Sequence, residues 1–61
     1  MNENIAVAEF DYEEMEEDEI SFVEGDRLTV IEKLEGDTWC RGVNQRTGQA
    51  GIYPANFVRF L

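Results

Sequence analysis

Histidine is absent from this chain, and cysteine, proline and tryptophan each occur only once. Without histidine, the chain lacks the commonest general base and a frequent zinc ligand. No nucleophile with a neighbouring base and no phosphate-binding loop is found either, so we expect neither an enzyme nor a bound cofactor or metal. Because small secreted domains usually carry several cysteines, the lone Cys40 favours a reducing, cytoplasmic setting.

Basic residues are also scarce, since five Lys and Arg stand against 14 Asp and Glu and the formal net charge is −9 at pH 7. Phosphate groups repel such a chain, so we expect neither nucleic acid nor a membrane surface as a partner. Apolar runs are only a few residues long, and residues 1–4 lack the basic and apolar regions of a signal peptide. The charge favours a basic partner.

The length of 61 residues allows one small domain and no more. A hydrophobic content of 43% argues for a folded core in spite of the charge. A chain this short buries only about 60% of its unfolded surface, which leaves no room for a deep substrate cavity. We therefore expect a single monomeric domain over 1–61, with its core at about 5–61 and flexible residues at 1–4.

Turn-forming residues divide the chain into short runs, and no window of helix length shows a sustained 3.6-residue repeat. These turns lie at Gly25-Asp26, at 35–37, at Thr47-Gly48 and at Pro54. They predict strands near 5–10, 27–33, 38–43, 49–53 and 58–60. Regular strands in so short a chain indicate an all-β fold, a small barrel whose closure limits its open edges.

Alternation within the predicted strands indicates which side chains form the core. Leu28 and Val30 share one face of the strand 27–33, and Ile31 lies on the other. The core candidates from such patterns are Ile20, Phe22, Leu28, Val30, Tyr53 and Val58. Small residues at Ala6, Ala8 and Gly42 predict two sheets that cross closely, whereas we expect Cys40 at the surface.

The single proline lies in residues 51–58, Gly-Ile-Tyr-Pro-Ala-Asn-Phe-Val. Its ring fixes φ and removes a hydrogen-bond donor, so the segment cannot continue as a central strand. Asn56 follows as a turn-forming residue. Such a segment would hold Pro54 and Phe57 rigidly near one surface, and together with Trp39 it predicts a peptide-binding module.

Three blocks carry a family resemblance. The first, residues 8–12 (Ala-Glu-Phe-Asp-Tyr), is similar to an Ala-Leu-Tyr-Asp-Tyr motif, and the second is Glu-Ile-Ser-Phe at 19–22 followed by Gly25-Asp26. The third is Trp39 with the proline segment at 51–58. In this order and at this spacing, over about residues 5–61, the blocks resemble the Src-homology-3 (SH3) domain family.

The resemblance implies a five-stranded, partly open barrel of two orthogonal antiparallel sheets. It also implies a non-catalytic module that binds proline-rich peptides in the polyproline II conformation. The binding residues carried over from the family are Phe10, Tyr12, Trp39, Pro54, Asn56 and Phe57. By the same resemblance, the Tyr12 hydroxyl, the Trp39 indole and the Asn56 amide would donate hydrogen bonds to ligand carbonyls.

Residues 13–19, Glu-Glu-Met-Glu-Glu-Asp-Glu, form an acidic run without a basic residue. The resemblance places Glu17, Asp18 and Glu19 opposite Trp39, where they would bind an Arg or Lys that flanks the ligand's prolines. For most positions of the run, a solvated loop that keeps the domain soluble remains the alternative. A calcium site is not predicted, because the Asp-x-Asp-x-Asp-Gly spacing is missing.

Two departures from the family pattern concern the partner. Phe10 and Phe57 stand where tyrosine is usual, so two hydroxyl donors are missing from the expected groove. Phenylalanine at the last aromatic position also occurs in the subset of the family that binds ubiquitin. Ubiquitin, or another globular surface, is therefore an alternative partner for the same groove.

Overall fold

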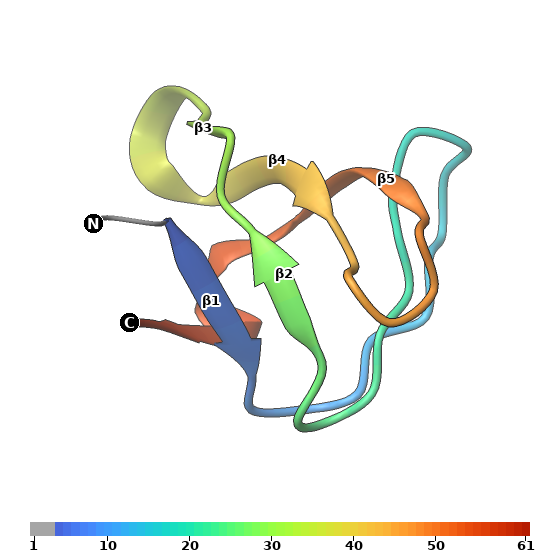
Figure 1. Ribbon diagram of the computed structural model, residues 1–61. Helices are drawn as coiled ribbons and strands as arrows, with labels where there is room; N and C mark the ends of the chain where they lie inside the picture. Colours follow the sequence, from blue (N-terminus) through green and yellow to red (C-terminus); the bar gives the residue numbers. More distant parts are fainter. Residues whose placement is uncertain (1–3) are drawn as a thin grey trace.

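Residues 4–61 form two three-stranded antiparallel sheets in the computed structural model (Figure 1). The first sheet has the order β2 (Arg27–Thr29), β1 (Ile5–Ala8), β6 (Val58–Phe60), and the second has the order β3 (Glu32–Lys33), β4 (Trp39–Val43), β5 (Ala50–Pro54). Residues 1–3, which belong to the segment expected to be flexible, lie outside the described residues. The predicted all-β, barrel-like fold is confirmed.

Short 3-10 turns stand in two of the connections, η1 (Glu35–Asp37) before β4 and η2 (Ala55–Phe57) between β5 and β6. The predicted strand 27–33 is divided into β2 and β3, because the chain leaves the first sheet there and enters the second. At the crossing point, the Ile31 N–H already donates to Arg41 of β4, at 2.8 Å. Within residues 4–61, no helix has the length and apolar character needed to cross a membrane.

The two sheets approach most closely where β2 meets β4, as the small residues predicted. A side chain at Gly42 would overlap the backbone carbonyl of Thr29 in the other sheet. The Val43 N–H donates to Thr29 Oγ1 at 2.8 Å, which fixes the crossing. Ala6 and Ala8 on β1 are buried as well. Only small residues fit at these positions, because packed interiors leave no space for added atoms.

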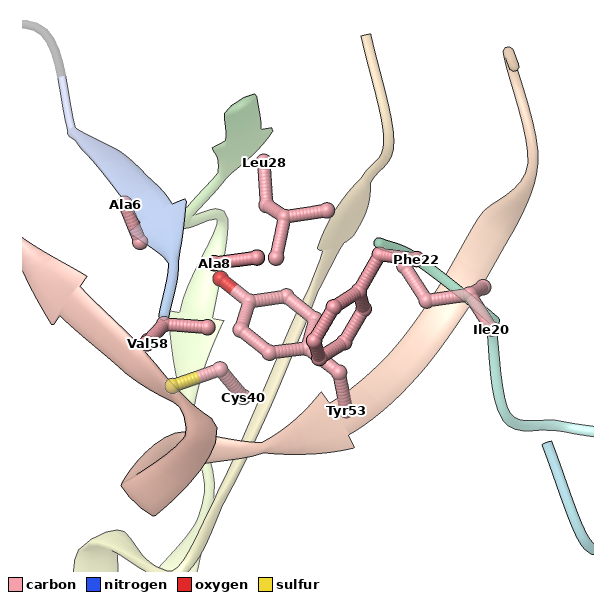
Figure 2. Packing of buried hydrophobic residues seen from close by; sticks show 8 residues of the cluster. All are labelled: Ala6, Ala8, Ile20, Phe22, Leu28, Cys40, Tyr53 and Val58. Atoms are coloured by element: carbon pink, nitrogen blue, oxygen red, sulfur yellow. The ribbon is translucent and has the colours of Figure 1, made fainter. Parts of the chain in front are cut away.

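The core lies between the sheets and contains Ala6, Ala8, Ile20, Phe22, Leu28, Cys40, Tyr53 and Val58 (Figure 2). Five of the six predicted core residues belong to it, and Val30 is partly buried against it. The Tyr53 ring lies centrally in this cluster, and its hydroxyl donates to the Thr29 carbonyl at 3.0 Å. A buried hydroxyl needs such a partner, so this bond makes tyrosine acceptable in the core.

Cys40 corrects one expectation, because the residue is fully buried (0% exposed) and not at the surface. Side chains alternate along β4, so Cys40 and Gly42 point inward while Trp39 and Arg41 point outward. Placing Trp39 at the surface therefore already required Cys40 to lie inside. Its burial raises the pKa of the thiol.

The long segment 9–26 folds back along β5 and carries the acidic run with it. It is the light-blue to teal loop of Figure 1. The Ile20 N–H donates to the Ile52 carbonyl at 3.0 Å, and the Ile52 N–H donates to the Asp18 carbonyl at 2.8 Å. Tyr12 and Phe22 pair across the base of the loop through two bonds of 2.9 Å. Backbone pairing thus holds Tyr12 and the acidic run beside the second sheet.

A buried polar network, which the sequence analysis did not foresee, ties this long segment to the turn between β4 and β5. The Asp26 carboxylate accepts hydrogen bonds from Arg46 Nε at 2.6 Å, from Arg46 Nη2 at 2.9 Å and from Asn44 Nδ2 at 3.0 Å. The Arg46 guanidinium holds the pKa of Asp26 well below its usual range. Asp26 and Asn44 lie 18 residues apart in the sequence, and the bond between them gives both buried side chains a hydrogen-bond partner.

Candidate functional site

Three aromatic rings from two segments, the long loop and η2, meet at one surface, and we call them the aromatic cluster: Phe10, Tyr12 and Phe57. The Phe57 ring lies edge-to-face with Phe10 (6.0 Å between centroids, 80°) and with Tyr12 (5.2 Å, 74°). The Glu9 N–H donates to the Phe57 carbonyl at 2.8 Å, which holds η2 against the start of the long loop. Phe10 is 57% exposed, so the cluster presents apolar ring surface to solvent.

Trp39 lies beside this cluster, at the start of β4. It pairs with Pro54 at the end of β5, and the Ala55 N–H donates to the Thr38 carbonyl at 2.9 Å. A shallow hollow of about 310 Å³ opens here, which we call the Trp39 hollow; its lining residues are Asp37, Thr38, Trp39, Pro54 and Asn56. Trp39 is half-buried and does not join the core, as predicted.

The turn η2 connects the two parts of the surface, because it carries Asn56 at the hollow and Phe57 in the cluster. Pro54, with φ −73° and ψ 129°, ends β5 and starts this turn. Because Pro54 lies at the end of the strand, its missing N–H does not remove a hydrogen bond from the sheet. The structure therefore brings the six predicted binding residues to two adjoining parts of one surface.

The Tyr12 hydroxyl is engaged within the protein, which differs from the expected role as a donor to a ligand. It donates to Glu19 Oε1 at 2.6 Å, and this bond to a carboxylate raises the pKa of Tyr12 to about 12. The ring also stacks on Phe22, at 5.7 Å and 29°. A hydroxyl has one proton, so Tyr12 can offer a ligand only acceptor capacity and an immobilised ring.

The three acids expected to select a basic residue lie in different environments. Glu17 and Asp18 are exposed, whereas Glu19 is only 7% exposed. The Glu19 carboxylate also accepts from the Met15 N–H at 2.9 Å, and the bonds from Tyr12 and Met15 lower its pKa. In residues 4–61, no group of three His, Cys, Asp or Glu side chains is arranged to hold a metal ion.

Asp37, which was not among the predicted site residues, lines the Trp39 hollow from η1. The backbone of Asp37 has φ 57°, a left-handed conformation that follows Gly36 at φ 82°. The signal was present in the sequence, because an acid in a Gly-Asp turn two residues before a surface tryptophan must lie near it.

Comparison with known proteins gives the same family as the motifs, since the SH3 domain family matches residues 7–55. Residues of this chain are 49% identical over 49 positions to protein kinase C and casein kinase substrate in neurons protein 2 of Gallus gallus. They are 46% identical over 54 positions to tyrosine-protein kinase Src64B of Drosophila melanogaster. The matches cover 80% and 88% of this chain but only 11% and 10% of those proteins.

Solved structures agree with this result over the whole chain. The C-terminal SH3 domain of myosin IB from Entamoeba histolytica superimposes with a TM-score of 0.86 at 31% identity, covering 100% of this chain and 89% of that one. A second structure of that domain, bound to a peptide named EhFP10(GEF), has the same TM-score. The chain therefore belongs to the SH3 domain family.

Proposed function

We propose that this domain binds proline-rich segments of other proteins in the polyproline II conformation. Membership of the SH3 family makes it a non-catalytic protein–protein interaction module. The observation that carries the finer proposal is the adjoining position of the aromatic cluster and the Trp39 hollow along η2. The peptide bound to the similar Entamoeba histolytica domain supports a peptide ligand.

The surface suits such a ligand physically. A polyproline II helix has about three residues per turn, no internal hydrogen bonds and a preformed shape, so docking it loses little entropy. Its proline rings would pack between Phe10 and Phe57, and between Tyr12, Phe57 and Pro54. The Trp39 indole N–H and the Asn56 amide remain as donors for the free ligand carbonyls.

The charge of the domain supports a ligand with Arg or Lys next to its prolines. Glu17 and Asp18 are exposed on the loop beside the surface, and the whole chain carries a formal charge of −9. Exposed pairs are each worth only about 0.2–1 kcal/mol, so the acidic run acts collectively by attracting basic ligands. Glu19 serves mainly to hold Tyr12 in this arrangement.

A second candidate partner is ubiquitin or another globular surface. The observation in its favour is the fully apolar part of the surface at Phe10 and Phe57, where no hydroxyl is present and the Phe10 ring is exposed. An apolar patch of this kind can bind a folded surface as well as a peptide. Both partners would use the same rings and so would compete.

The chain spans only 5 to 20% of the length of the first curated relatives it matches, so its role in a larger protein is also part of the proposal. We propose that it acts as a monomeric adaptor in a cytoplasmic signalling or cytoskeletal protein. There it would recruit a proline-rich, basic segment of a second protein.

A peptide titration tests the main proposal. Peptides with a proline-rich core and Arg at one or the other end should bind with a Kd of about 1 to 50 µM, because the interface is small and shallow. Trp39→Ala should abolish binding while NMR spectra show an intact fold. Raising NaCl from about 50 mM to about 500 mM should weaken binding by wild type. Full affinity in Trp39→Ala would contradict the proposed site.

A further inference from the structure

One side chain, Gln49, joins both arms of the long loop to the start of β5. Its Nε2 donates to Glu14 Oε1 at 2.7 Å, and its Oε1 accepts from the Ser21 N–H at 3.2 Å. Glu14 lies on the outgoing arm of the loop and Ser21 on the returning arm. In Figure 1, the turn between β4 and β5 lies beside both arms. A single amide thus binds the two arms from outside the loop.

Glu14 and Ser21 also bind each other, so the three residues form a closed ring of hydrogen bonds, which we call the Gln49 bracket. Ser21 Oγ donates to Glu14 Oε1 and accepts from the Glu14 N–H, both at 2.9 Å. The bonds from Gln49 and Ser21 lower the pKa of Glu14, because they stabilise its charged form. Since each member binds the other two, displacing one of them weakens the whole ring.

The residues that hold Tyr12 stand on either side of Ser21 in the sequence. The Tyr12 hydroxyl donates to Glu19, while its backbone pairs with Phe22 and its ring stacks on the Phe22 ring. If the two arms of the loop moved apart, these partners would move with the returning arm. The Tyr12 ring would then shift relative to Phe57 in the aromatic cluster.

Gln49 itself does not belong to the proposed binding surface. It lines a different hollow of about 430 Å³, and it is absent from the residues that line the Trp39 hollow. Tyr12 is the one member of the aromatic cluster that also lines this second hollow. Any effect of Gln49 on a ligand at the aromatic cluster must therefore pass through the long loop and Tyr12.

We propose that Gln49 is a positioning residue for the peptide-binding surface, because by joining Glu14 and Ser21 it keeps the loop at the spacing that holds Tyr12 against Phe57. The inference rests on the proposed function, since it adds a determinant of the same surface that lies outside it. A side-chain amide suits this place, because it donates and accepts at the same time. Neither a carboxylate nor an aliphatic side chain of similar size can do both.

The decisive variant is Gln49→Glu, which keeps the size of the side chain but places a second carboxylate against Glu14. An ionised carboxylate cannot donate, and the two like charges repel, so the ring should open. A proline-rich peptide with Arg at one end should bind about threefold to tenfold more weakly, as for the loss of one hydrogen bond. General attraction predicts the opposite sign, because the variant gains a negative charge and the peptide is basic.

Two further variants isolate the ring. Gln45→Glu adds the same charge to the exposed part of the same turn, and it should leave the affinity unchanged or slightly higher. The double variant Glu14→Gln with Gln49→Glu exchanges the amide and the carboxylate and keeps the net charge of wild type. Position 14 then supplies the donor and position 49 the acceptor, so the affinity should return to within about twofold of wild type.

The ring-proton chemical shifts of Tyr12 give a second readout, which needs no ligand. They depend on the neighbouring rings of Phe22 and Phe57, so they report the position of the Tyr12 ring within the cluster. They should change in Gln49→Glu, stay as in wild type in Gln45→Glu and return in the double variant. The amide spectrum of each variant verifies that the domain is folded.

The possible results separate this assignment from the proposed function. If wild type does not bind the peptide, the proposed function is wrong, and the Tyr12 shifts still decide whether Gln49 positions the ring. If Gln49→Glu binds as tightly as Gln45→Glu, or if the double variant does not recover, the positioning role is overturned and peptide binding stands. Unchanged Tyr12 shifts in a weakly binding Gln49→Glu would likewise contradict the assignment.

Discussion

The hydroxyl of Tyr12 donates a hydrogen bond of 2.6 Å to the carboxylate of Glu19, seven residues further along the chain. Tyr12 belongs to the aromatic cluster and Glu19 ends the acidic run, so this bond joins the two features that the sequence presents separately. It also changes both roles, because the hydroxyl is no longer free and Oε1 of the largely buried Glu19 accepts two hydrogen bonds within the protein. The acidic run thereby becomes part of what holds the aromatic cluster in shape.

This contact makes the ionisation of Tyr12 depend on Glu19. The bond raises the pKa of Tyr12 to about 12, so Glu19→Gln, which removes the negative charge, should lower it toward its usual value of about 10. The first tyrosine ionisation, followed by ultraviolet absorbance at high pH, should therefore occur at lower pH in the variant. An unchanged titration curve would show that the bond is absent in solution.

Acid should weaken the domain through Asp26. Arg46 holds the pKa of this carboxyl below its unfolded value of about 4, so the pair stabilises the fold above pH 4 and loses this contribution as the pH falls below it. Arg46→Gln should lower the free energy of unfolding by about 1–2 kcal/mol at pH 7, since Arg46 is itself largely exposed.

Urea denaturation of both proteins at several pH values checks this prediction. The difference between wild type and Arg46→Gln should be constant from pH 7 to about pH 5 and should shrink below pH 4. Arg59→Gln is a suitable control, because its pair with Glu9 is exposed and long, at 3.7 Å. A difference that did not change with pH would mean that Arg46 stabilises the fold through packing alone.

The crossing of the two sheets should not accept a single added methyl group. In Gly42→Ala, the new carbon would overlap the Thr29 carbonyl, so β2 and β4 would have to move apart. We expect a loss of about 1–3 kcal/mol in the free energy of unfolding, as is usual for overpacking. Thermal or urea denaturation measures it, and a variant as stable as wild type would contradict the close approach.

Phe57 should decide between the two candidate partners. Phe57→Tyr adds a hydroxyl to the surface where the ring contacts Phe10 and Tyr12. The new hydroxyl can donate a hydrogen bond to a peptide carbonyl, but it also places a polar group in an apolar patch. Affinity for proline-rich peptides should stay the same or increase, and any affinity for ubiquitin should fall. Titrations of the same variant with both ligands compare the two directly.

Much of the fold could be predicted from local pattern. Alternation identified Leu28, Tyr53 and Val58 as core, and turn residues located the strands to within a few positions. The small size of Gly42 predicted the sheet crossing, because only a residue without a side chain fits there. The division of 27–33 was not predicted, because it depends on where the chain passes from one sheet to the other. The burial of Cys40 was also missed, although alternation along β4 from the surface residue Trp39 implies it.

The sequence by itself determined the family, the barrel fold that follows from it, and the residue types of the proposed binding surface, because proline, aromatic and glycine positions restrict the backbone wherever they occur. Only the tertiary structure decided the surroundings of each acid. Glu19 is largely buried and its Oε1 accepts from Tyr12 and Met15, while Asp37 is exposed and lines the Trp39 hollow from η1. Charge can be counted along a chain, but its availability depends on the hydrogen-bond partners that folding brings beside it.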